Sequence, residues 1–244
     1  MHPSLTIATS ARVLRQLQHD KRTLGLLFVV PCVLMGLLAW IYGDSPTFDF
    51  IGAPLLGIFP FLMMFIITSI TTLRERSSGT LERLLAMPIG KLDILGGYAL
   101  AFGLVAIAQS AIVSTLSVYA FGLDIAGPQW FLMLIALVDA LLGTALGLCA
   151  SALARTEFQA VQFMPAFVLP QALLCGLIMP IEQLPNILEA LARVLPLTYA
   201  VDAMQLVTRE ATPSAQAYGD VMIVLAFALA AVFLGSVTLR RRSK

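Results

Sequence analysis

Six long apolar stretches constrain the fold of this chain more than any other feature of its sequence. A helix needs about 20 apolar residues to cross the roughly 30 Å hydrocarbon core of a bilayer. Six stretches approach or exceed this length, at approximately residues 24–42, 51–73, 94–121, 130–153, 158–179 and 221–239. We therefore expect an all-α membrane protein with six transmembrane helices in a single transmembrane domain over residues 24–244.

The composition argues for the same fold class. Hydrophobic residues make up 59% of the 244 residues and charged residues only 12%, whereas a typical soluble domain is about 45–50% apolar and about 25% charged. The formal net charge is +1, which offers no net attraction to a polyanion. These values argue against a soluble globule, a disordered chain and a nucleic-acid-binding protein.

The distribution of the basic residues predicts the orientation of the spans. Thirteen of the fifteen Lys and Arg residues lie before the first span, after the last span, or in the loops after the second and fourth spans. The alternate loops contain only Arg193 and Arg209. Because basic residues accumulate in cytoplasmic loops, we expect both termini in the cytoplasm of a multi-pass protein of the cell membrane.

Two further segments are expected to be helical without spanning the bilayer. Within residues 1–23, Ile7, Ala11, Leu14 and Leu17 recur at helical spacing, which predicts an amphipathic helix on the cytoplasmic surface. A simple basic flank is the alternative interpretation. Residues 180–220 predict an external re-entrant hairpin of two short helices, the first capped by Asn186 and the second covering about residues 198–207.

Residues suited to catalysis or metal binding are sparse. The cysteines lie separately in apolar stretches at positions 32, 149 and 175, and the two histidines lie near the N-terminus. No lysine follows the glycine pattern of a phosphate-binding loop. We therefore expect a non-enzymatic chain that binds no metal, no cofactor and no ATP of its own.

The cytoplasmic loop over residues 74–92 carries charges of both signs. Gly79 permits a turn, and Pro88 closes the segment that follows it. Between them, Leu81, Leu84 and Leu85 form an apolar face at helical spacing. This pattern predicts a short amphipathic helix that docks in a groove of a protein partner; resting on the lipid interface is the alternative.

Three stretches resemble type-2 ABC-transporter permeases, closest to the daunorubicin-resistance type of drug-export permease. Residues 74–88 resemble the Glu-Arg-x-x-Gly-Thr-Leu-Glu-x-Leu-x-x-x-Pro stretch of this family, and residues 176–185 and 195–204 resemble two later stretches in the same order. The sequence departs from many relatives at Met204-Gln205, where they carry an arginine.

The resemblance implies the membrane subunit of an ATP-driven exporter of hydrophobic or amphipathic small molecules, such as drugs, antibiotics or lipid-like compounds. Two separate ABC ATPase subunits would bind ATP and Mg²⁺, and a second copy or a homologous permease would complete a dimer in the bilayer. The loop after the second span would supply the helix that couples to the ATPase. The coupling residues are Arg74, Glu75, Arg76, Gly79, Thr80, Leu81, Glu82, Arg83, Leu84 and Leu85.

Asp139 is the candidate for a polar substrate contact, because it is the one carboxylate deep within a predicted span. A charge at the bilayer centre costs about 2.5–3.5 kcal/mol on insertion scales. Gly143, Gly147 and Ser151 follow it at four-residue steps and indicate close helix packing. Asp139 could therefore instead bond to Gln109 or Ser110 in the third span. Two weaker candidates for the substrate path are Gln162 and Gln171.

Four alternatives remain open at this point, and one of them is a passive structural subunit, which would not explain the cytoplasmic loop. A polysaccharide or glycolipid export permease would share the same topology. An ion-coupled secondary transporter needs an ion site in the membrane and usually internal repeats, and only Asp139 is suited to such a site. A membrane enzyme needs converging catalytic groups, which the positions of Ser, His and Cys do not provide.

Overall fold

Helices make up the regular structure of the chain. The computed structural model describes residues 3–43, 45–79 and 90–238. In chain order its elements are α1 (Pro3–His19), α2 (Lys21–Tyr42), α3 (Pro46–Ser77), α5 (Lys91–Tyr119), α6 (Gln129–Leu153), α7 (Glu157–Leu174), the 3₁₀ helix η1 (Ile181–Gln183), α8 (Asn186–Ala192), α9 (Pro196–Arg209) and α10 (Ala215–Thr238). The expected all-α fold class is confirmed.

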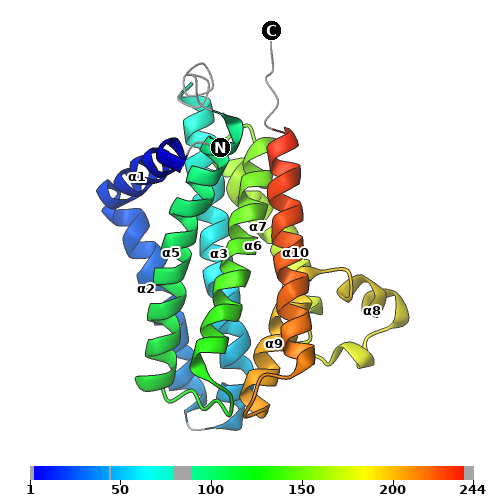
Figure 1. Ribbon diagram of the computed structural model, residues 1–244. Coiled ribbons are helices and arrows are strands. Elements are labelled where there is room, and N and C mark those ends of the chain that lie inside the picture. The colour runs from blue at the N-terminus through cyan, green and yellow to red at the C-terminus, as the bar shows by residue number, and fades with distance from the viewer. Residues whose placement is uncertain (1–2, 44, 80–89, 239–244) are drawn as a thin grey trace.

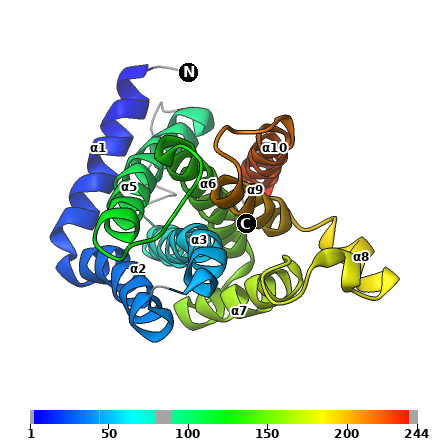
Figure 2. The same ribbon diagram turned by 90° about the horizontal axis from the view of Figure 1, so that it is seen from below.

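The helices α3 and α6 form the centre of the bundle. Helix α3 packs against α2, α5, α6, α7 and α9, and Figure 2 shows it surrounded by its neighbours. Two groups of buried apolar side chains meet along it, one shared with α6, α9 and α10 and the other with α1, α2 and α5. A displacement of α3 therefore alters both parts of the core.

Five helices are long and apolar enough to cross a membrane, within the described residues. They are Lys21–Tyr42, Pro46–Ser77, Gly96–Tyr119, Gln129–Leu153 and Ala215–Gly235. The expected fifth span, residues 158–179, is shorter: α7 continues through two prolines but ends at Leu174. Gly176 then adopts a φ of +88°, a left-handed conformation that commonly follows the end of a helix. The six-span count stays a prediction.

The N-terminal segment is helical but divides earlier than the sequence suggested. Helix α1 ends at His19, and Asp20 caps α2 by accepting hydrogen bonds from the Thr23 backbone N–H and hydroxyl at 3.1 and 2.6 Å. Helix α1 packs against α5 and α2. Its buried face contains Val13 and Leu17, whereas Ile7 of the expected apolar stripe is 60% exposed. The buried face thus differs in part from the predicted one.

The helices α8 and α9 lie toward the end of the bundle opposite α1 (Figure 1). Asn186 is the first residue of α8 and Pro185 precedes it as the cap, without a side-chain capping bond. The expected capping role of Asn186 is therefore wrong, because the helix begins one residue earlier. Helix α9 buries one face, including Leu197, Val201 and Met204, while α8 projects from the bundle with Ile187 83% exposed.

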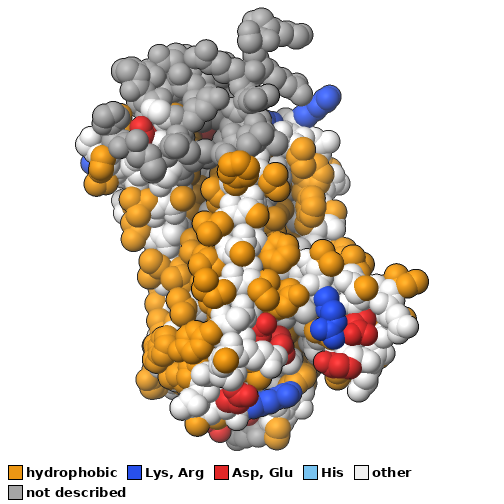
Figure 3. Space-filling model, turned by 45° about the vertical axis from the view of Figure 1, so that its right-hand side comes forward, with side chains coloured by type: hydrophobic (Ala, Val, Ile, Leu, Met, Phe, Trp, Pro, Cys, Tyr) orange, Lys and Arg blue, Asp and Glu red, His pale blue; other side chains and the backbone are white. Residues whose placement is uncertain are grey.

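The surface of the bundle separates apolar and charged side chains. Hydrophobic side chains run along the side that Figure 3 shows, and several acidic and basic side chains gather toward the end that carries α8 and α9. Exposed apolar residues such as Leu26, Trp40, Leu229 and Phe233 belong to helices long enough to span a membrane. Such a surface is suited to contact with lipid chains.

Candidate functional site

The last turn of α3 carries three consecutive charged residues, Arg74, Glu75 and Arg76. Successive side chains on a helix point about 100° apart. Three neighbours can therefore reach three different helices, and the structure shows that they do. This turn is the beginning of the loop over residues 74–92, for which the sequence predicts a coupling role.

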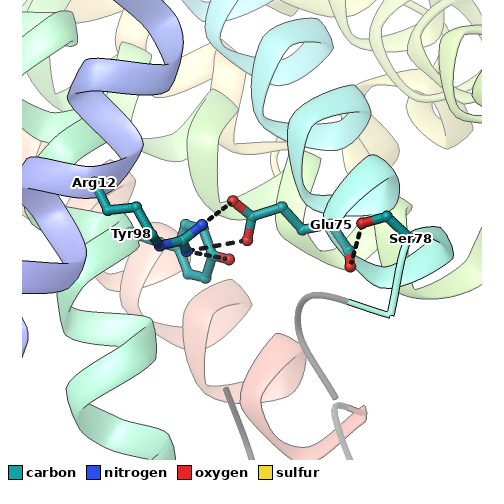
Figure 4. A network of polar contacts seen from close by, with 4 residues as sticks. All are labelled: Arg12, Glu75, Ser78 and Tyr98. Atoms are coloured by element: carbon teal, nitrogen blue, oxygen red, sulfur yellow. Dashed lines mark hydrogen bonds and ion pairs between the residues drawn. The ribbon is translucent and has the colours of Figure 1, made fainter. Parts of the chain in front are cut away.

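Glu75 connects α3 to α1, and its partner Arg12 connects α1 to α5 (Figure 4). Its two carboxylate oxygens accept hydrogen bonds from Nη1 and Nη2 of Arg12 at 2.8 and 3.2 Å, and Nη2 also donates to the hydroxyl of Tyr98 at 3.3 Å. The side chain of Glu75 is only 3% exposed and that of Arg12 is 33% exposed. A buried carboxylate is tolerated when it is both paired and hydrogen-bonded, as here.

Arg74 connects α3 to the first residue of α7. Its Nε and Nη2 donate to the two carboxylate oxygens of Glu157 at 2.8 and 3.0 Å. Both side chains are about half exposed, so solvent screens the pair. The hydrogen bond from Arg74 holds the pKa of Glu157 below its ordinary value.

Arg76 connects α3 to the C-terminal end of α6. Its guanidinium donates to the backbone carbonyl of Ala152 at 3.0 Å and to that of Ala154. The last carbonyls of a helix lack partners within the helix and carry a partial negative charge. An arginine at this position therefore stabilises the end of α6 and fixes its distance from α3.

After this network the chain enters the loop for which the sequence predicts a coupling role. Ser78 donates from its hydroxyl to the carbonyl of Glu75, and Gly79 adopts a φ of +71°, which favours glycine. Of the ten residues assigned to coupling, the structure places Arg74, Glu75, Arg76 and Gly79. The other six, Thr80, Leu81, Glu82, Arg83, Leu84 and Leu85, lie outside the described residues.

Asp139 lies in the interior of the bundle, on α6. It is 0% exposed, and neither carboxylate oxygen has a hydrogen-bond partner among the described residues. A Cβ placed on Gly57 of α3 would collide with Met204 of α9 and come within 3.3 Å of Asp139 Oδ2. The carboxyl group therefore lies where α3, α6 and α9 meet.

The three glutamine candidates occupy different surroundings. Gln109 is buried on α5 and donates to the backbone carbonyl of Leu27 on α2 at 2.9 Å. Gln171 is buried on α7 and donates to the carbonyl of Phe167 within its own helix. Gln162 is exposed on α7. The expected alternative in which Asp139 bonds to Gln109 or Ser110 is not found. Gln109 donates to α2 instead, and the hydroxyl of Ser110 has no partner among the described residues.

Small residues let α6 approach α3 closely, one and two turns after Asp139 along α6. A Cβ on Gly143 would collide with the backbone carbonyl of Phe61, and one on Gly147 would lie 2.5 Å from that of Phe65. Ser151 is buried and donates to Leu148 within its own helix at 2.7 Å. The two glycines thus lie at a close backbone approach between the two central helices.

Sequence reasoning missed the partners of the charged turn. Arg12 was counted among the basic residues before the first span and placed on the polar face of the N-terminal amphipathic helix, although it is the partner of Glu75. Tyr98 and Glu157 were not considered. An Arg-Glu-Arg run at the end of a span indicates that partners are needed, but single-sequence spacing cannot identify residues 63 and 83 positions away.

The described residues form an all-helical bundle in which five helices are long and apolar enough to cross a membrane. Residues 4–208 match the model of the ABC-2 type transporter family. Because this match covers most of the chain, the protein belongs to that family and is a membrane-spanning permease.

Several curated proteins are similar over about two thirds of the chain. The probable multidrug ABC transporter permease YbhR of Escherichia coli is 29% identical over 65% of this chain and 44% of its own. The linearmycin resistance permease protein LnrN of Bacillus subtilis is 27% identical over 70% and 44%. ABC transporter G family member 20 of Dictyostelium discoideum is 28% identical over 68% and 23%. The matched part therefore spans less than half of each relative.

Proposed function

We propose that this chain is the permease subunit of an ATP-driven exporter that moves a hydrophobic or amphipathic small molecule out of the cytoplasm. A separate ABC ATPase, present in two copies, binds ATP and Mg²⁺, and two permease subunits pair in the cell membrane. The chain contains no phosphate-binding loop of the Walker type, which agrees with hydrolysis by a partner. Both termini face the cytoplasm in this proposal.

The observation that carries the proposal is the charged turn at the end of α3. Arg74, Glu75 and Arg76 attach this turn to α7, α1 and α6, and Tyr98 extends the attachment to α5. The loop proposed to dock on the ATPase follows directly. A displacement of that loop is therefore passed to four helices through short ionic and hydrogen bonds. Coupling requires only that the ATPase bind two packings of the bundle with different free energies.

The substrate class is supported by the named relatives. Two similar proteins are described as multidrug and linearmycin-resistance permeases, which favours a small amphipathic molecule over a polysaccharide or glycolipid. Asp139 is the leading candidate for a polar contact along the substrate path, because its buried oxygens have no partner in the described part of the chain. Gln171 and Gln109 each keep one buried unpaired oxygen and are secondary candidates.

The first experiment is a pull-down from detergent with the ATPase encoded beside this gene. We compare the wild type with Leu84→Glu, which places a charge on the predicted docking face. The matched control is Ser4→Glu, which adds the same charge at an exposed position on α1, outside the loop over residues 74–92. We expect the ATPase to co-purify with the wild type and the control but not with Leu84→Glu.

The outcomes separate the alternatives. Normal binding and transport by Leu84→Glu would overturn the assignment of the docking face. If no neighbouring ATPase binds the wild type, the ion-coupled secondary transporter gains support, and Asp139 becomes the residue to test for proton or sodium coupling. If the ATPase binds but only glycolipids stimulate its activity, the polysaccharide or glycolipid alternative is favoured.

A further inference from the structure

A cavity of about 260 Å³ lies between α1, α2 and α3. It is separate from Asp139, which faces α3 and α9. Its volume is below the roughly 300–1,000 Å³ of pockets that enclose drug-sized ligands. Leu26, on its α2 side, is 60% exposed, so the cavity lies beside the outer surface of the bundle. A narrow cavity of this kind suits a single chain better than a bulky substrate.

The cavity has a polar end and an apolar end. Gln16, Asp20, Thr23 and Arg74 line it where α1 ends, α2 begins and α3 ends. Further along, α2 contributes Leu26 and Val30, and α3 contributes Ile70, Ile66 and Met63. Met63 lies eleven residue steps before Arg74 on α3, which corresponds to about 16 Å at 1.5 Å per residue. That depth is close to half of the roughly 30 Å hydrocarbon core.

The residues that line the polar end include one basic side chain, Arg74, and one acidic side chain, Asp20. Two further basic residues, Lys21 and Arg22, follow Asp20 directly in the chain and are exposed on the first turn of α2. The carboxylate of Asp20 accepts two hydrogen bonds from Thr23; these bonds hold its pKa below the ordinary value. Arg74 bonds to Glu157 through Nε and Nη2. Within the described residues, its Nη1 therefore stays available to a phosphate oxygen.

We propose that this cavity binds an anionic phospholipid, with one acyl chain between α2 and α3 and the headgroup phosphate at Arg74. The polar end of the cavity matches the headgroup of a lipid in one leaflet, and the apolar end matches its acyl chain. Basic residues at the headgroup level attract anionic lipids. The phosphate competes with Glu157 for the Arg74 guanidinium, so the lipid regulates the ion pair that connects α3 to α7. This regulatory consequence rests on the proposed function, whereas the binding itself does not.

The test is native mass spectrometry of the purified full chain in detergent, with phosphatidylglycerol or phosphatidylcholine added. We expect the wild type to retain phosphatidylglycerol about fivefold better, which corresponds to about 1 kcal/mol for one basic residue near the headgroup. Arg74→Gln should remove this preference but keep chain binding. Ile66→Trp, which fills the apolar end, should lose both lipids, and Leu229→Trp, on the exposed face of α10, should behave like the wild type.

Two results would overturn the proposal. The first is equal retention of the two lipids by the wild type. The second is unchanged retention by Ile66→Trp that elutes as a single species with wild-type helix content. Val30→Phe fills the same end from α2 and replaces Ile66→Trp if that variant fails to fold. Because no ATPase is present, failure here is distinct from failure of the proposed function, which the pull-down detects.

Discussion

The charged turn of α3 and the interior around Asp139 handle buried carboxylates in opposite ways. Glu75 is 3% exposed and bonds to Arg12 through both oxygens. Asp139 is 0% exposed, and both of its oxygens lack partners in the described part of the chain. A paired buried carboxylate links helices, whereas an unpaired one carries a desolvation cost without a compensating bond. The first site therefore holds helices together, whereas the second leaves a buried carboxyl group without a partner in the described residues, for which we propose a contact with the substrate.

Packing separates the two regions further. The centre of the α3–α6 contact depends on glycines against backbone carbonyls, while the end of α3 depends on side-chain bonds. In a membrane, close packing rather than the hydrophobic effect drives helix association. We therefore expect the interior contact to be the less tolerant of substitution.

Gly143→Val should have the largest effect on stability. The added side chain meets the backbone of Phe61, which cannot rotate away as a side chain can. Overpacking typically costs about 1–3 kcal/mol, and we expect about 3 kcal/mol here. The measurement is the thermal unfolding midpoint in detergent. Gly219→Val on α10, where a Cβ meets open space, is the control, and equal losses would contradict the prediction.

Glu75→Ala should have the second-largest effect on stability. It leaves the guanidinium of Arg12 partly buried without its partner. Breaking a fully buried pair costs about 3–5 kcal/mol, and because Arg12 is one third exposed we expect about 2–3 kcal/mol. A double-mutant cycle with Arg12→Ala measures the coupling energy. A coupling energy no larger than that of the exposed Arg74–Glu157 pair would remove the distinction between the two pairs.

Asp139→Asn should change stability little and transport strongly. The amide has nearly the same size and keeps polar atoms at the same place. If Asp139 contacts the substrate, the loss of one charge-assisted hydrogen bond, worth about 1.5–3 kcal/mol, lowers transport by about tenfold or more. Transport is measured per assembled complex. Collapse of assembly with unchanged transport per complex would show instead that the residue is structural.

The pH dependence of the Arg74–Glu157 pair should be the smallest effect. The pKa of Glu157 is lowered in the folded protein, so the stabilisation is present above its ordinary value of 4.5 and is lost as the pH falls through the lowered value. An exposed pair contributes at most about 1 kcal/mol. Unfolding midpoints from neutral pH to below pH 4.5, for the wild type and Glu157→Gln, test this. Identical pH profiles for the two proteins would refute it.

Much of the fold follows from local sequence patterns. Apolar stretches near residues 24–42, 51–73 and 130–153 coincide with α2, α3 and α6, because span length depends on hydropathy alone. The end of α7 was misplaced, since its early stop depends on the backbone conformation of Gly176. Helix periodicity likewise predicted α1 but not which face of it meets α5.

The candidate site could be predicted only in part, for a different physical reason. The charged run at Arg74–Arg76 is visible in the sequence, and Asp139 stands out as a carboxylate in an apolar stretch. Their surroundings depend on contacts between distant segments. Whether Asp139 bonds to Gln109 depends on how α5 rotates about its axis, and that rotation is set by packing against α2 rather than by any local pattern.

The last turn of α3 has a mechanical consequence. Its three charged side chains bond directly to residues of α1, α7 and α6, and Arg12 of α1 in turn bonds to Tyr98 of α5. Successive side chains on a helix point about 100° apart. A rotation of α3 by one residue step would therefore move all three side chains away from their partners together. A rotation of this turn is therefore either resisted by the bonds of all three side chains or breaks all of these bonds together. We therefore expect the end of α3 to move between discrete positions rather than to shift gradually.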